Sequence, residues 1–131
     1  MSFSLVVSIT AIAAFLLGIG WLFFSPLLMR RWGMTVHEEA IVVGRRLGTV
    51  YLGMAIILFL AREVPVSELR LAITAGLLFA MVVLAIIGFR EYQAKRVNAS
   101  ILISVGLEIF LAIGYSQVLI DDIKVLSGAS L

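Results

Sequence analysis

Three charged residues lie inside segments that are otherwise apolar, and these residues are the most able to do chemistry. Glu108 lies in the middle of the apolar run 99–120, and Arg45 and Arg46 lie inside the run 36–61. A charge at the centre of a membrane helix costs about 2.5–3.5 kcal/mol on insertion scales, so such residues usually face a partner or a cavity. These three side chains are therefore the first candidates for a functional site.

Glu108 belongs to a small and polar stripe of its predicted helix. Ser104, Ala112 and Tyr115 lie four residues before, four after and seven after it, which places them on one helical face. The functional interpretation of this stripe is a proton relay or a ligand contact. The structural interpretation is an internal ion pair or a protonated acid bonded to a neighbour. We favour the structural one, because a buried polar group needs a partner in any protein.

Arg45 and Arg46 point about 100° apart around their helix, so they cannot face the same way. A seam of small residues and one tyrosine accompanies them: Gly44, Gly48, Tyr51 and Ala55. We expect Arg45 to face inward beside this seam and Arg46 to reach toward lipid head groups as an interface anchor. An anion or lipid-phosphate site is the alternative. The glycine spacing permits close helix packing, which we expect within the chain.

We predict that Arg45 pairs with Glu108. Each lies ten residues from the predicted start of its helix, counted from Thr35 and Asn98, so both lie ~15 Å along their helices from the same side. Pairing would offset much of the cost of two isolated charges in lipid.

The residues required by most catalytic and cofactor sites are missing from the sequence. There is no cysteine and a single histidine, His37, which excludes thiolate nucleophiles and a two-histidine haem site within the chain. No P-loop, nucleophile elbow, dinucleotide fingerprint or zinc motif is present. We expect no catalytic residue, no cofactor and no metal, and we interpret His37 as a solvated residue of a first helical turn.

The composition predicts the elements that hold these residues. Of the 131 residues, 63% are hydrophobic and 14% are charged, whereas a soluble domain carries roughly 25% charged residues. We predict one all-α integral membrane domain over 1–131, folded as an antiparallel up-down-up-down four-helix transmembrane bundle. The predicted spans are 3–24, 36–61, 68–89 and 99–120, with an interfacial segment at 26–32.

Local signals mark the ends of these segments. Ser25 and Pro26 are typical of a helix start, Gly33 is typical of a helix end, and residues 35–38 fit a capping box that would open the second span. Acidic residues at 121 and 122 mark the exit of the fourth span. Trp21 and Trp32 lie near predicted boundaries, where we expect them to anchor the chain at the membrane interface.

The residues from FLLGIGWLFFSPLLMRRWGM to GRRLGTVYLGMAIILFLAR resemble small bacterial four-helix membrane proteins related to the DoxX-like families. Members share a glycine-rich stretch and a proline after span one, an arginine and a Tyr-Leu-Gly or Tyr-Gly-Gly segment in span two, and often an acid in the last span. This chain departs in its doubled Arg45-Arg46, and it has Leu52 where the Tyr-Gly-Gly form has a glycine after the tyrosine. The resemblance implies a bundle in the bacterial inner membrane and makes a quinone-facing accessory role conceivable.

Three hypotheses for the function follow. The first is a non-catalytic accessory or assembly subunit, or a bundle with a lipid pocket, whose partners are membrane lipid and a larger membrane complex or further copies of the chain. The alternatives are a small oligomeric proton-coupled transporter that uses the predicted polar cluster, and, by analogy alone, a quinone-linked oxidoreductase accessory subunit. We expect no nucleic-acid partner, because the basic residues are better explained by membrane orientation.

Orientation is the first testable prediction. Seven basic residues lie in or beside the first and third loops and three on the opposite side, which predicts cytoplasmic loops and both termini outside the cytoplasm. A phosphatase fused to the C-terminus is expected to be active in cells. An inactive phosphatase, together with a fluorescent cytoplasmic reporter at the same position, would reverse the orientation.

Overall fold

Five α-helices form the protein in the computed structural model, which describes residues 1–128 and leaves the last three residues of the predicted domain outside the description. They are α1 (Phe3–Phe23), α2 (Ser25–Arg31), α3 (Glu38–Ala61), α4 (Glu68–Gln93) and α5 (Ile101–Leu126). Within the described residues, four helices are long and apolar enough to cross a membrane, and α2 is the short fifth. The prediction of an all-α chain with four long apolar helices is confirmed.

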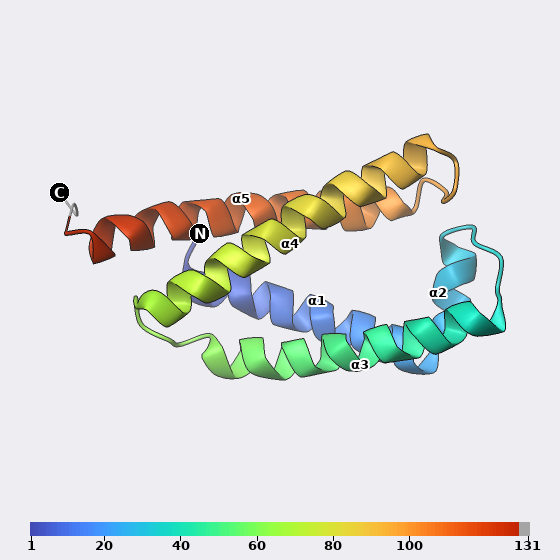
Figure 1. Ribbon diagram of the computed structural model, residues 1–131, viewed down its shortest axis with the longest axis horizontal. Helices are drawn as coiled ribbons and strands as arrows, with labels where there is room; N and C mark the ends of the chain where they lie inside the picture. The colour runs from blue at the N-terminus through green and yellow to red at the C-terminus, as the bar shows by residue number, and fades with distance from the viewer. Residues whose placement is uncertain (129–131) are drawn as a thin grey trace.

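The long helices form two antiparallel hairpins. α1 packs along α3, and α4 packs along α5, whereas the two hairpins meet mainly where α1 touches α5 (Figure 1). The hairpins converge at the end that holds the N-terminus and the 62–67 link, which we call the terminal end. They diverge at the end that holds α2 and the 94–100 link, which we call the loop end (Figure 1).

The chain bends between α1 and α2, so the separate segment predicted at 26–32 is present as a short helix. Pro26 lies in its first turn, where the missing N–H removes no intrahelical hydrogen bond. Ser25 does not cap α2 as expected, because its hydroxyl donates back to the Trp21 carbonyl. Gly33 follows the helix with a φ of +76°, a conformation that favours glycine.

Several helices begin or end away from the predicted span boundaries, and α4 continues to Gln93, past the predicted 89. α3 begins at Glu38, with His37 at the N-cap and no side-chain cap bond, so the capping box at 35–38 does not form. Residues 33–37 are needed to carry the chain from α2 to the start of α3. α5 continues to Leu126, past the predicted exit at Asp121. The longer helix is favoured because Asp122 has a partner on α4.

Glycines let α1 and α3 approach closely. A Cβ on Gly48 would lie 2.6 Å from the backbone nitrogen of Leu22 and 2.8 Å from the carbonyl oxygen of Gly18. A Cβ on Gly44 would lie 2.7 Å from a ring carbon of Trp21. Both glycines of the predicted packing seam thus lie in an interface within the chain, where a larger residue would force the helices apart.

The hydrophobic core fills the half of the molecule near the terminal end. Its buried members come from all four long helices: Phe3, Val6, Val7, Ala11, Leu58, Leu77, Leu111, Tyr115 and Val118. The hydroxyl of Tyr115 lies 2.5 Å from that of Thr10, which itself donates to the Val6 carbonyl at 2.8 Å. Since a hydroxyl has one hydrogen to donate, Tyr115 is the donor to Thr10, and this bond ties α5 to α1 inside the core.

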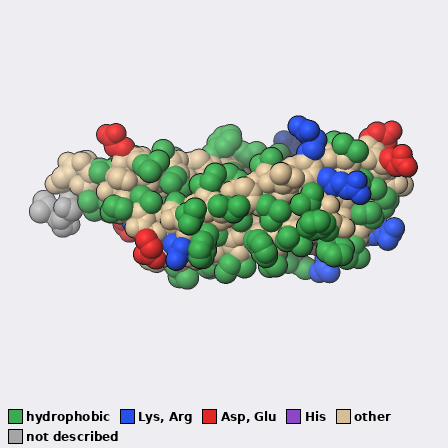
Figure 2. Space-filling model, turned by 90° about the horizontal axis from the view of Figure 1, so that it is seen from below, with side chains coloured by type: hydrophobic (Ala, Val, Ile, Leu, Met, Phe, Trp, Pro, Cys, Tyr) green, Lys and Arg blue, Asp and Glu red, His purple; other side chains and the backbone are tan. Residues whose placement is uncertain are grey.

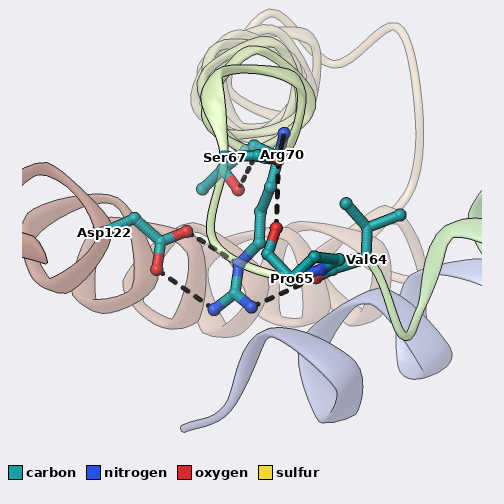
Figure 3. Close-up of polar contacts among 6 residues, drawn as sticks. Val64, Pro65, Ser67, Arg70 and Asp122 are labelled. Atoms are coloured by element: carbon teal, nitrogen blue, oxygen red, sulfur yellow. Dashed lines mark hydrogen bonds and ion pairs between the residues drawn. The ribbon is translucent and has the colours of Figure 1, made fainter. Parts of the chain in front are cut away.

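An ion pair between Arg70 of α4 and Asp122 of α5 closes the terminal end (Figure 3). Arg70 Nε lies 2.8 Å from Oδ2 and Nη2 lies 3.1 Å from Oδ1, while the Asp122 side chain is 2% exposed. Nη1 also donates to the Val64 carbonyl at 3.3 Å, and Cζ lies 4.4 Å from the centroid of the Phe3 ring. One guanidinium therefore joins α4 to α5, to the 62–67 link and to α1.

Replacing Gly48 with alanine is expected to destabilise the protein by about 1–3 kcal/mol, because the added Cβ meets backbone atoms that only a helix shift can move. Thermal unfolding in mild detergent, followed by circular dichroism, measures the effect. Gly53→Ala is the matched control on the same helix, since nothing lies within 4 Å of its added Cβ. Equal losses for both variants would show that the α1–α3 approach is not the cause.

Replacing Asp122 with asparagine is expected to cost about 3 kcal/mol of stability, because it leaves Arg70 uncompensated. The double change Arg70→Met with Asp122→Leu should recover part of the loss, since no unpaired charge remains. The same unfolding measurement applies. Asp121→Asn is the control, because that neighbouring acid is exposed. A double variant no more stable than Asp122→Asn would contradict the coupling.

Candidate functional site

A cavity of about 390 Å³ lies between the hairpins in the half of the molecule near the loop end. All four long helices and the links at the loop end contribute to its wall, most of which is aliphatic. Its aromatic, polar and acidic lining residues are Thr10, Trp21, Trp32, Tyr51, Glu91, Ser104 and Glu108. A mainly apolar cavity of this size with a few polar groups is typical of a small-molecule site.

Hydrogen bonds hold the two hairpins together at the loop end. The Asn98 side-chain amide and the Ser100 hydroxyl donate to the Arg31 carbonyl at 2.9 Å and 2.7 Å. The Asn98 backbone N–H donates to the Trp32 carbonyl at 2.9 Å. These carbonyls belong to the end of α2, where the last turn of a helix has no intrahelical donors. The 94–100 link therefore supplies the missing donors and bridges the diverging hairpins.

The two tryptophans meet at the cavity. The centroids of the Trp21 and Trp32 rings are 5.8 Å apart and their planes are inclined by 64°, which is an edge-to-face contact. Trp21 is 8% exposed, because its ring occupies the space that Gly44 leaves open. The prediction that Trp21 anchors the chain at the membrane interface is not supported, because the ring is buried within the protein. Trp32 is half-buried and lines the cavity beside it.

Glu108 contributes to the cavity a carboxyl oxygen that has no hydrogen-bond partner in the described chain. Its Oε2 has less than 1 Å² of exposed surface and no hydrogen-bond partner among residues 1–128. Ser104 lines the cavity one turn earlier on α5, and Tyr51 lines it from α3 on the other hairpin. A buried carboxyl oxygen without a partner is unfavourable, so such an atom is a natural contact for a bound molecule.

The predicted Arg45–Glu108 pair is wrong. Arg45 is exposed on α3, and the ion pairs found within the described chain are Arg62–Glu63, Arg70–Asp122 and Arg96–Glu91. The prediction failed because it assigned the wrong side of α3 to the bundle interior. Leu47 lines the cavity, and Arg45, two residues earlier, projects from nearly the opposite side of the helix. Arg46 is also exposed, in agreement with its expected outward direction.

The predicted polar cluster is thus divided between three places. Ser104, Tyr51 and Glu108 line the cavity, Tyr115 belongs to the hydrophobic core, and Arg45 lies on the outer surface. His37 is exposed at the N-cap of α3, and the described residues contain no group of three side chains able to hold a metal ion.

The charges at the cavity all have one sign. Two carboxyl groups, those of Glu91 and Glu108, line the wall, and within residues 1–128 no lysine, arginine or histidine does. Glu91 was not identified from the sequence. It pairs with Arg96 across the end of α4, where Nη2 of the arginine lies 3.1 Å from Oε1. Among the described residues, Glu108 is therefore the acid of the cavity whose carboxyl group has no basic partner.

Comparison with known proteins adds no relative to this description. No family model matches the chain, and neither a curated protein nor a solved structure matches it. The relation to the DoxX-like families therefore stays a prediction, and the argument for a function rests on the cavity.

Proposed function

We propose that this chain is a multi-pass protein of the bacterial inner membrane that binds an apolar, lipid-soluble molecule between its two hairpins. The cavity is the observation that carries the proposal, because it combines a largely aliphatic wall with polar groups confined to a few positions. Four helices of sufficient length and hydropathy support the membrane location. On the face drawn in Figure 2, charged side chains gather toward the two ends and a hydrophobic band separates them.

The distribution of basic residues supports an orientation with the loop end in the cytoplasm and both termini outside. In this orientation the packed core lies in the outer half of the membrane and the cavity in the inner half. Trp32 and the 94–100 link then lie near the cytoplasmic head groups, and Glu108 lies deeper, among the acyl chains.

Of the two non-catalytic roles expected from the sequence, the cavity favours the lipid-pocket bundle over the assembly subunit. An assembly subunit needs complementary outer faces, and its interior has no reason to remain open, because close packing is the default state of a helical core. A partly open cavity between the hairpins, lined by Trp21, Tyr51 and Glu108, instead resembles a ligand site.

Filling the cavity tests the proposal. Ala13→Phe introduces a phenyl ring at the cavity wall, and we expect the variant to lose most of the lipid-soluble molecule that copurifies with the wild type in mild detergent. Native mass spectrometry and analysis of lipid extracts measure the bound amount. Ala75→Phe is the matched control, since Ala75 is exposed on α4 and outside the cavity wall. A wild type with nothing bound, or equal occupancy in all three proteins, would count against the proposal.

A further inference from the structure

We infer that the cavity is selective for lipophilic organic cations, with the Glu108 carboxylate as their counter-ion. The inference deepens the proposed function and rests on it, because it requires the cavity to be a binding site. It specifies the charge of the molecule that the site accepts.

The first argument is the balance of charge in the wall. The ionisable side chains that line the cavity are two carboxyl groups, and one of them, Glu91, is paired with Arg96. Glu108 has no such partner in the described chain, and its Oε2 is buried. A buried charge is tolerated when it is paired. A cationic ligand supplies the pairing charge, whereas an anionic one would be repelled in a medium of low dielectric constant.

The second argument is the aromatic lining. Trp21 and Trp32 meet edge to face at the cavity, and Tyr51 lines it from α3. The faces of aromatic rings attract cations, and tryptophan does so most strongly. The remaining wall is mainly aliphatic, which suits the apolar rings or chains of an organic cation rather than a hydrated metal ion. The acid and the aromatic rings therefore select for the same class of ligand.

The two tryptophans make binding measurable. They are the only tryptophans in the sequence, and both line the cavity, so quenching of intrinsic fluorescence reports on its occupancy. We would titrate the full chain in phosphatidylcholine nanodiscs with three probes of related shape: the cation tetraphenylphosphonium, the neutral triphenylphosphine oxide and the anion tetraphenylborate. Free probe concentrations from equilibrium dialysis correct for partition into the lipid.

Each probe is then compared between the wild type and Glu108→Gln, so that membrane partition cancels. We expect Glu108→Gln to weaken tetraphenylphosphonium binding by about tenfold, because the variant lacks the charge that attracts the cation, and not to weaken binding of the neutral oxide. Glu108→Asp keeps the charge and should retain part of the affinity. Glu63→Gln is the control, because it removes an exposed acid at the terminal end.

The outcomes separate this inference from the proposed function. Equal weakening of the cation and the oxide by Glu108→Gln, or no weakening of either, overturns the charge selectivity and leaves the apolar site standing. Failure of all three probes to quench the wild type saturably contradicts both. If the Glu108→Gln variant is not monodisperse, the comparison of the cation and the anion on the wild type is the test. Saturable quenching by the phosphonium but not by the borate supports the inference, and saturable quenching by the borate overturns it.

Discussion

The Arg70 guanidinium is the constraint on which the arrangement of the helices depends. It binds the Asp122 carboxylate in two places, donates to the Val64 carbonyl and lies over the Phe3 ring. These contacts hold the start of α4, the end of α5 and the start of α1 at one position. The net gain in free energy from a buried pair is small, because desolvation opposes the Coulomb attraction. Its effect is to specify which helix ends meet.

Because the hairpins are held together at the terminal end, their divergence has to appear at the loop end. There they are joined through hydrogen bonds to the Arg31 and Trp32 carbonyls rather than through a packed core. Because one half is packed and the other is hollow, the buried polar groups of Tyr115 and Glu108 differ in whether they have a partner. Tyr115 finds Thr10 in the packed half, whereas Glu108 faces open space in the hollow half.

Hydropathy and proline placement were sufficient to predict the four long helices and the bend before α2, because both depend on local sequence. The facing of Arg45 was not predictable in this way, since Gly44 and Gly48 mark the side of α3 that meets α1 but not which flanking side faces the cavity. The Arg70–Asp122 pair, in contrast, could have been predicted from the sequence. Antiparallel order places the start of the third span and the end of the fourth at the same end of the bundle. The cavity depends on the distance between hairpins, which no local pattern encodes.

The pairing of helices that are consecutive in the chain has a consequence for biosynthesis. The close α1–α3 interface, with Gly18 against Gly48, is built entirely from the first 61 residues. It can therefore form before α4 and α5 have been synthesised, since contacts of short sequence separation form early. The second hairpin is closed separately, by the ion pair that Asp122 of α5 forms with Arg70 of α4. The hollow between the hairpins is thus the boundary between two parts that pack mainly within themselves.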